Sequence, residues 1–336
     1  SIHASCNQLK FSTSDFDNTL LDFSGGRLEL CYYNQFSGSD LEFTGTTLKI
    51  TNNNEIDNSN LFIYSGTDTI NESNDISNAE IEFSGDELYI LGPNNITNSA
   101  LDLANGNINI EDGNSFVNSS IAIHDPLDEA SFIDIIDNSF DNDSIIDANA
   151  VVTIENYMNY LVEDNDFSYS SGRGIELFYA GWDGRGTQSI EDNTIQFTGT
   201  AYPQIAELGI HSYYSTVQIA NNQITDNDYG IAGFHGSNLT IIGDPQATSN
   251  DSTQLIADNT ISQCVFNYSS FPTEFEYNVI RDYTSGTNPF IQAVEYDEMI
   301  IDTNQNREIR GIPDFVVENN CWVDHSDPSL RLIPLG

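Results

Sequence analysis

Large apolar residues recur with a period of 20 residues between residues 16 and 123. In each unit the sixth and eighth positions are apolar, and the thirteenth and fifteenth positions repeat likewise, except at Asp68. Because the members of each pair are two residues apart, each pair predicts a short strand with one buried face. A third short strand is predicted around the apolar residue that opens each unit, and the Gly, Ser, Asn and Asp residues in between predict turns. The units open at Phe16, Phe36, Ile56, Ile76, Ile96 and Phe116.

An asparagine two residues before a large apolar residue marks one turn of nearly every unit. Asparagine tolerates the left-handed turn conformation, and its amide can hydrogen-bond to the turns above and below. We therefore interpret the column as a structural asparagine ladder rather than a ligand site, and interpret Asn58, Asn78, Asn98 and Asn118 in the same way. The main column consists of Asn34, Asn54, Asn74, Asn94, Asn114, Asn138, Asn165, Asn193, Asn222, Asn259, Asn278 and Asn320.

A fixed period of this size predicts stacked repeats, in which each unit packs on its neighbours. A helical repeat needs about 30 residues or more, so the units are too short for a helical solenoid. Leucine-rich repeats need a denser leucine pattern and a differently spaced asparagine. We predict an all-β solenoid of about 12 coils, with three short strands per coil and parallel stacking between coils.

Further motifs support this architecture. Gly-Ile strand starts occur at Gly174-Ile175, Gly209-Ile210 and Gly230-Ile231, and Asn319-Asn320-Cys321-Trp322 lies near the end. With the Asn-x-Ile and Asn-x-Phe turns, these motifs resemble the right-handed, single-stranded parallel β-helix family, in particular secreted bacterial surface proteins built of parallel β-helix repeats. The resemblance covers nearly the whole chain and implies the fold rather than an activity, because one fold hosts many functions.

The spacing also predicts how the solenoid is organised. We expect one domain, with an N-terminal cap or partial coil at 1–15 and regular 20-residue coils at 16–123. Irregular coils with inserted loops follow at 124–320, and a C-terminal cap or linker at 321–336. Loops on a rigid scaffold are where function commonly resides.

The charge balance excludes some partners. The chain has 52 acidic and 9 basic residues, a net charge of -43. Such a chain repels phosphate backbones and anionic membranes, so neither nucleic-acid binding nor membrane insertion is expected. Asp22, Glu42, Glu82 and Asp102 form an acidic column, interrupted by Phe62. We favour a solvated acidic face screened by salt, and expect no cofactor; calcium is the one ion that the column could hold.

The cysteines do not define a metal site. Cys6, Cys31, Cys264 and Cys321 lack metal-ligand spacing, and four cysteines allow three disulfide pairings that the sequence does not distinguish. We expect Ser1 to follow a removed signal segment, which suits a secreted protein located outside the cell or on its surface.

Candidate chemistry gathers in three consecutive coils. If Ile175, Ile210 and Ile231 point inward, alternation places Glu176 beside His211 on the surface. Phe178, Tyr213 and Phe234 then form an exposed aromatic strip. Aromatic faces beside polar groups suit sugar rings, and a Glu/His pair could transfer protons. The alternative is an ordinary aromatic stack partly covered by the long loops. Nearby candidates are Tyr179, Tyr214, His235, Trp182, Asp183 and Arg185.

The stretch Trp322-Val323-Asp324-His325 resembles the Trp-Ile-Asp-His motif of pectate lyases, which are also β-helices. In that family later coils supply an arginine base and a calcium-binding acidic cluster. Here only Arg331 follows, so this departure speaks against a lyase site. The alternative is a terminal cap in which Trp322 closes the core.

Two function classes follow. The first is a non-enzymatic extracellular protein, a spacer, adhesin or surface-filament subunit that can also bind polysaccharides or cell-surface glycans. Unpaired strand edges at a β-helix end would favour its end-to-end self-association. The alternative is a carbohydrate-active enzyme, a polysaccharide lyase or glycoside hydrolase, that uses Glu176 and His211.

Overall fold

The computed structural model describes residues 1–64, 66–125, 130–142, 150–181, 186–199 and 207–243, followed by the shorter stretches 254–257, 259, 262–267, 269–270, 272–276, 278–281, 291–294, 317–318 and 321–323. These residues form strands joined by turns and bends, and none of them lies in a helix. Accordingly, the described part of the chain contains no helix with the length and hydropathy of a membrane span. The predicted all-β architecture is confirmed.

The contacts divide the chain into two units. Unit 1 comprises Ser1–Asn142 and Ile154–Tyr160, and unit 2 comprises Asp143–Thr153 and Leu161–Gly336. Strands β22 (Ala150–Glu155) and β23 (Asn159–Glu163) each contain residues of both units.

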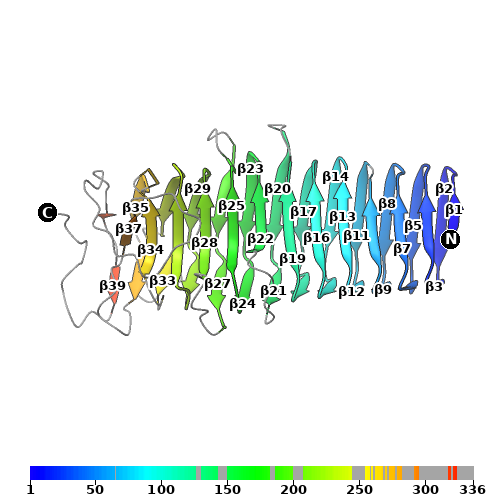
Figure 1. The fold of residues 1–336 in the computed structure, drawn as a ribbon, viewed down its shortest axis with the longest axis horizontal. Coiled ribbons are helices and arrows are strands. Elements are labelled where there is room, and N and C mark those ends of the chain that lie inside the picture. Colours follow the sequence, from blue (N-terminus) through cyan, green and yellow to red (C-terminus); the bar gives the residue numbers. More distant parts are fainter. Residues whose placement is uncertain are drawn as a thin grey trace. The chain divides into compact units, whose positions relative to one another are not determined.

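Unit 1 is a parallel β-helix with three strands per coil, and the strands of each sheet lie side by side (Figure 1). Sheet A contains β1 (Ile2–Ala4), β4 (Leu20–Phe23), β7 (Asp40–Phe43), β10 (Asn60–Ile63), β13 (Glu80–Ser84), β16 (Ala100–Ala104) and β19 (Ser120–His124). Sheet B contains β2 (Gln8–Ser12), β5 (Arg27–Cys31), β8 (Thr47–Thr51), β11 (Thr67–Asn71), β14 (Glu87–Leu91), β17 (Asn107–Glu111) and β20 (Phe132–Ile136). Sheet C contains β3 (Asp15–Asp17), β6 (Gln35–Ser37), β9 (Glu55–Asp57), β12 (Asp75–Ser77), β15 (Asn95–Thr97), β18 (Ser115–Val117) and β21 (Ser139–Asn142).

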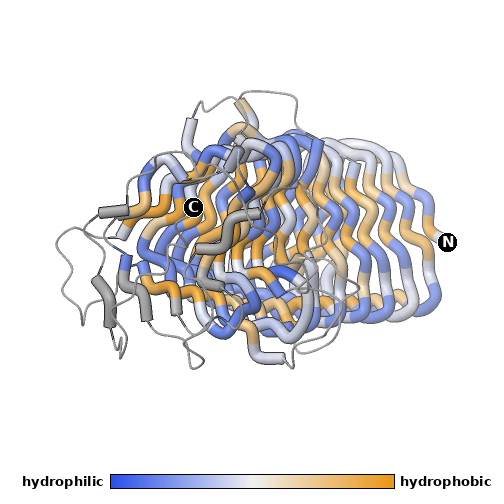
Figure 2. Tube along the Cα trace, turned by 60° about the vertical axis from the view of Figure 1, so that its left-hand side comes forward, coloured by the Kyte–Doolittle hydropathy of each residue, from blue (hydrophilic) through white to orange (hydrophobic). Residues whose placement is uncertain are grey.

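The predicted columns form the core of unit 1. Along β13, for example, Ile81 and Phe83 are fully buried, and Glu82 between them is partly exposed. Ile81 pairs in register with Leu61 and Leu101, so equivalent side chains stack from coil to coil. In Figure 2 orange and blue residues alternate along the tube of this unit, with orange lying beside orange in successive coils. Each buried aliphatic side chain contributes roughly 1.5–3 kcal/mol of transfer free energy.

Asp68 keeps its place in this core although it breaks the apolar column. Its side chain is fully buried, and its Oδ1 accepts the backbone N–H of Leu48 at 2.6 Å. A buried polar group is tolerated when it is hydrogen-bonded. The exception in the pattern therefore changes the local bonding without changing the fold.

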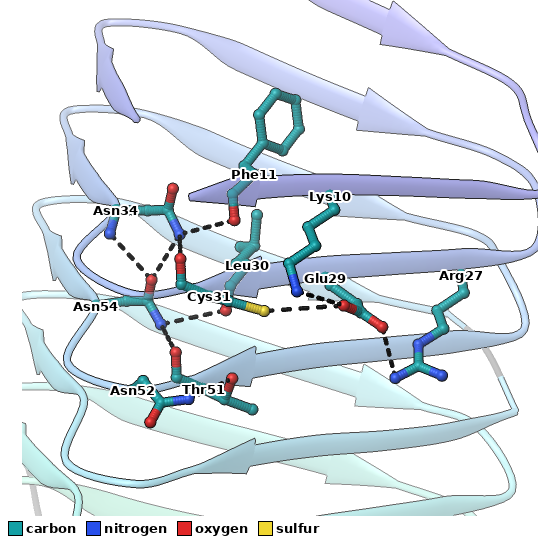
Figure 3. A network of polar contacts seen from close by, with 10 residues as sticks. All are labelled: Lys10, Phe11, Arg27, Glu29, Leu30, Cys31, Asn34, Thr51, Asn52 and Asn54. Carbon is teal, nitrogen blue, oxygen red and sulfur yellow. Dashed lines mark hydrogen bonds and ion pairs between the residues drawn. The ribbon is translucent and has the colours of Figure 1, made fainter. Parts of the chain in front are cut away.

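The asparagine ladder is present in unit 1 and joins the corners of successive coils. Asn34 donates from Nδ2 to Oδ1 of Asn54 at 2.8 Å, and its backbone N–H reaches the same oxygen at 3.1 Å (Figure 3). The amide of Asn34 also bonds to the Cys31 carbonyl oxygen at 3.0 Å. The same donor–acceptor pattern continues from Asn54 through Asn74, Asn94 and Asn114 to Asn138. The column consequently satisfies backbone groups that would otherwise be buried without a partner.

The second asparagine column lies at the surface. Asn58, Asn78, Asn98 and Asn118 all have φ close to +50°. Asn98 donates to Asn78, and Asn118 to Asn98, at 3.3 Å. Asparagine occurs here because the turn needs the left-handed region. The interpretation of this column as structural is consistent with these bonds.

A buried serine column, which the sequence analysis did not identify, serves the next corner. The hydroxyl oxygen of Ser39 accepts the backbone N–H of Thr19 at 2.9 Å, and that of Ser59 accepts the N–H of Ser39 at the same distance. Ser99 and Ser119 repeat the contact. The serine column could have been predicted from the sequence, because these serines are spaced by multiples of 20 residues.

Unit 2 has the same three-sheet architecture. Sheet A contains β25 (Arg173–Phe178), β28 (Leu208–Tyr213), β31 (Tyr229–Phe234), β34 (Ser262–Asn267) and β37 (Ile291–Val294). Sheet B contains β26 (Gln188–Glu191), β29 (Thr216–Ala220), β32 (Asn238–Ile242), β35 (Glu274–Glu276) and β38 (Val317–Glu318). Sheet C contains β24 (Asp166–Tyr169), β27 (Thr194–Phe197), β30 (Gln223–Thr225), β33 (Leu255–Ala257), β36 (Val279–Arg281) and β39 (Cys321–Val323).

The asparagine ladder of unit 2 corrects one prediction. It runs from Asn165 through Asn193 to Asn222 and then to Gln254, whose Oε1 accepts the backbone N–H of Asn222 at 2.6 Å. Asn259, which was predicted for this place, instead accepts the backbone N–H of Asn227 at 2.9 Å, at the corner that serine serves in unit 1. The prediction was wrong because it considered only asparagines two residues before a large apolar residue. Gln254 lies two residues before Ile256 and carries the same amide on a longer side chain.

Strand β31 is buried on both faces along its whole length. All six of its residues are buried. A second apolar cluster lies on the outer face of sheet A and consists of Leu208, Tyr229, Ala232, Phe234 and Val265, with Tyr213 packed against it. Residues on this face are therefore not all accessible to solvent.

Candidate ligand-binding site

Three neighbouring strands of sheet A carry the residues that the sequence singled out. The register pairs Glu176 of β25 with His211 of β28, and Phe178 with Tyr213. Tyr213 pairs in turn with Phe234 of β31. The side-by-side placement predicted from the aligned Gly-Ile starts is confirmed.

Glycines allow these coils to approach closely. A Cβ added at Gly174 would lie 2.7 Å from the Gly209 carbonyl oxygen and 2.9 Å from Cγ2 of Ile195. A Cβ at Gly209 would lie 2.5 Å from the Gly230 carbonyl oxygen. These distances leave no room for a side chain, so only glycine fits. At Gly174 and Gly209 the Gly-Ile start thus reflects a packing requirement between coils.

Glu176 is the centre of a polar trio with Arg173 and His211. Its Oε1 accepts a hydrogen bond from Nη1 of Arg173 and lies 3.0 Å from Nδ1 of His211. Side-chain exposure is 12% for Glu176, 15% for Arg173 and 1% for His211. The sequence analysis missed Arg173, although it lies three residues before Glu176.

The environment shifts both titrating members of the trio. Burial raises the pKa of Glu176, but the hydrogen bond with His211 and the charge of Arg173 outweigh burial and hold this pKa below its usual range. Burial lowers the pKa of His211, and the charge of Arg173 lowers it further, against the raising effect of Glu176. At neutral pH the trio therefore contains one cation, one anion and a neutral imidazole.

Two of the predicted surface residues are not at the surface. His211 is 1% exposed, and Phe234, which was expected in the exposed strip, is also 1% exposed. The expectation of exposure was wrong because outward alternation in a strand gives a solvent-facing side chain only where nothing covers the sheet. Here the outer face carries the second apolar cluster, which includes Phe234.

The accessible part of the site is an aromatic platform formed by Phe178, Tyr179, Tyr213, Tyr214 and His235. The rings of Phe178 and Tyr213 stack with centroids 4.8 Å apart and planes inclined by 14°. Those of Tyr179 and Tyr214 stack at 5.0 Å and 5°. His235 lies 4.1 Å from the ring of Tyr213 and 4.9 Å from that of Tyr214. Tyr179 and Tyr214 are the most exposed of the five, at 39% and 41%.

Three residues of the platform have an unusual backbone conformation. The φ angles of Tyr179, Tyr214 and His235 are +53°, +51° and +55°. Bulky residues avoid this region, since their Cβ crowds the backbone at a penalty of roughly 1–2 kcal/mol each. Positive φ also recurs at other turns, including those of Tyr32 and Asn52, so it is a property of the turns and not of the platform alone. The conformation places aromatic rings at a turn where asparagine or glycine would be less strained.

Several predicted site residues lie outside the described part of the chain. These are Trp182, Asp183, Arg185, Asn320, Asp324, His325 and Arg331. For Cys321 and Trp322 only the backbone of β39 is described. The structure therefore gives no geometry for the motif that resembles the pectate lyases.

The acidic residues of unit 1 stack in register as predicted, and a histidine contacts the acidic residue at each end of the column. Asp22 pairs in register with Glu42, and Glu82 with Asp102. Nδ1 of His3 lies 2.8 Å from Asp22, and Nε2 of His124 lies 2.5 Å from Asp102. Among the residues that the structure describes, no three His, Cys, Asp or Glu side chains converge to hold a metal ion. The solvated acidic face without a cofactor, with calcium as the one possible ion, stays a prediction from the sequence.

The basic residues near the start of unit 1 form ion pairs with one carboxylate. Glu29 lies 3.2 Å from Nζ of Lys10 and 2.5 Å from Nη2 of Arg27 (Figure 3). Cys31 lies beside this group and, like Cys6 and Cys264, is a free cysteine. No disulfide joins these three cysteines.

Comparisons with known proteins add no family assignment. No protein-family model, no curated protein and no solved structure matches this chain. The function has to be inferred from the fold and the site themselves.

Proposed function

We propose that this chain is an extracellular β-helix protein with a structural or adhesive role, and that its aromatic platform binds glycans. The observation that carries the proposal is the pair of parallel ring stacks, Phe178 on Tyr213 and Tyr179 on Tyr214. The faces of aromatic rings carry negative charge density and attract the C–H groups on the apolar face of a sugar ring. The inner faces of each stack are covered by the partner ring, so a sugar would pack on the outer faces and edges of the stacks. A bacterial surface adhesin, spacer or filament subunit would use such a platform to attach to polysaccharide.

The platform suits binding because it is preorganised. Phe178 and Tyr213 belong to β25 and β28, whose inward neighbours Leu177 and Ser212 are fully buried. Tyr179 and Tyr214 follow at the strand ends, and each backbone N–H bonds to the next coil, at 3.0 Å and 3.3 Å. A ligand that meets fixed rings loses little free energy to ordering them.

The alternative of a carbohydrate-active enzyme receives less support. A general base must come within hydrogen-bonding reach of the proton that it removes. His211 is buried, and Oε1 of Glu176 already interacts with both His211 and Arg173. The Glu176/His211 pair is better suited to holding the site together than to turnover.

Glycan-array binding tests this proposal with matched pairs of tyrosines. In the variant Tyr179→Ala/Tyr214→Ala we expect a loss of affinity of about tenfold or more, since each aromatic contact contributes roughly 0.5–1.5 kcal/mol. Tyr32→Ala/Tyr33→Ala is the control, because these tyrosines are also exposed and also have positive φ, but belong to unit 1. Equal losses in both variants, or no glycan bound by the unaltered chain, would contradict the proposal.

A depolymerisation assay with the bound glycan separates binding from catalysis. We expect no turnover from the unaltered chain. Turnover that Glu176→Gln or His211→Ala abolishes would establish the enzyme instead.

Secretion and self-association belong to the same proposal. The high negative charge supports a location away from nucleic acid. The outermost strands of stacked parallel sheets have unpaired edges, to which a second copy of the chain could bind. Sedimentation over a range of concentrations tests self-association, and a chain that is monomeric throughout would remove that part.

A further inference from the structure

We propose that Glu176 sets the charge preference of the aromatic platform: by pairing with Arg173 it makes the platform accept neutral sugars and reject sugars that carry a carboxylate or sulfate. This inference rests on the proposed glycan binding and adds the class of glycan.

The polar trio lies beside the aromatic rings of the platform. Glu176 precedes Phe178 by two residues on the outer face of β25, so the two side chains are neighbours along the strand. The rings of His211 and Tyr213 are related in the same way on β28, with centroids 6.5 Å apart. The charged groups therefore border the ring stacks.

Positive charge is scarce among the described side chains of unit 2. Arg173 is the one lysine or arginine of unit 2 whose side chain the structure describes. A guanidinium is the group best suited to bind a carboxylate or sulfate, through parallel hydrogen bonds. Here it faces Glu176 of the same strand, and both side chains are only 15% and 12% exposed.

The surroundings of the platform add no compensating positive charge among the described residues. His211 contributes no positive charge at neutral pH, because its burial disfavours the imidazolium. The trio as a whole is then neutral, and it belongs to a chain with a net charge of -43. Among the described side chains of unit 2, an anionic sugar would therefore meet no lysine or arginine other than the paired Arg173, whereas a neutral sugar needs only the aromatic rings and hydroxyl partners.

The test compares two ligands that differ in charge alone. They are the neutral oligosaccharide that binds best on the array, and the same oligosaccharide oxidised to uronic acid at C6. We expect the unaltered chain to prefer the neutral form by about tenfold, because the net charge of -43 repels a carboxylate. Equal affinity for the two forms would overturn the inference while leaving the proposed glycan binding intact. If neither form binds, the proposed function fails and the inference fails with it.

The variant Glu176→Gln releases the charge of Arg173 and keeps an oxygen that can accept its hydrogen bond. We expect its affinity for the oxidised form to rise about fivefold, the size of a partly exposed ion pair, with the neutral form changed by less than about twofold. Glu191→Gln is the matched control, since it removes the same charge from β26 in sheet B. An equal rise in the control would show that net charge, rather than Glu176, sets the preference.

A measurement on the unaltered chain keeps the inference testable if the variant does not fold. Raising the salt concentration screens repulsion. The affinity for the oxidised form should therefore increase with salt, while that for the neutral form stays constant. A fall in affinity for the oxidised form would mean that attraction governs its binding, which would overturn the inference.

Discussion

The side-chain oxygen of Gln254 accepts the backbone N–H of Asn222 at 2.6 Å. The side-chain oxygen of Asn222 accepts the backbone N–H of Asn193 in the same way. Gln254 and Asn222 are both fully buried. The ladder consequently requires a side-chain amide at this corner and tolerates one additional methylene group. It does not strictly require asparagine.

This contact predicts a local loss of stability in the variant Gln254→Leu. The substitution leaves the buried backbone N–H of Asn222 without its acceptor, while the side-chain amide keeps the Ile190 and Ala220 carbonyl oxygens, so the local free energy of opening should fall by about 1–3 kcal/mol. Hydrogen exchange at the corner between β29 and β30 measures the loss, because repeat proteins open locally. Gln223→Leu is the control, since Gln223 is exposed and we expect a change of less than about 0.5 kcal/mol. Equal exchange rates in both variants would contradict the prediction.

A second prediction concerns backbone strain at a turn of unit 1. Tyr32 has φ of +59° and is 51% exposed, and the equivalent residue of the next coil is Asn52, with φ of +65°. Tyr32→Asn should raise the free energy of unfolding by roughly 1 kcal/mol, since asparagine enters the left-handed region more readily. Urea unfolding measures the change. The reverse substitution, Asn52→Tyr, should lower stability by a similar amount, and a stabilising effect there would refute the argument.

His124 makes unit 1 more stable in mild acid. Burial lowers the pKa of His124, but the hydrogen bonds and charges of Asp102 and Asp125 outweigh burial and raise it above 6.5. Because the folded pKa exceeds the unfolded one, this contribution is fully present below pH 6.5 and is lost as the pH rises through the folded pKa. A titration of the imidazole by NMR checks the direction. Asp102→Asn should lower the measured value, and a midpoint below 6.5 in the unaltered chain would exclude the mechanism.

His211 gives unit 2 the opposite pH dependence. Burial lowers its pKa below 6.5, so the unfolded state takes up the proton more readily. Its contribution is therefore present above pH 6.5 and is lost as the pH falls toward the folded pKa. Hydrogen exchange at β28, measured on both sides of that pH, should show less protection on the acidic side. The variant His211→Asn should lose this difference, and an unchanged difference would assign it to another group.

Sequence reasoning succeeded where one structural rule applied to many coils. The strands of unit 1 were predicted correctly because a stacked repeat places side chains such as Leu61, Ile81 and Leu101 in one column. The equivalent position is apolar in six coils, so the sequence indicates its burial six times. The neighbourhood of Glu176 and His211 followed from the same reasoning. Asn259 was assigned to the wrong corner because the irregular coils have no fixed period, so the assignment depended on one asparagine. Gln254 forms the hydrogen bond that was expected of Asn259.

The sequence by itself determined the β-helix, the ladder that joins its corners and the pairing of strands across coils, since all three depend on periodicity along the chain. Only the tertiary structure decided which outward side chains reach solvent. His211 and Phe234 alternate outward like Phe178 and Tyr213, yet they are buried while Phe178 and Tyr213 are partly exposed. The physical reason is that exposure depends on what packs over the outer face of the sheet, a contact between distant segments that strand periodicity does not encode.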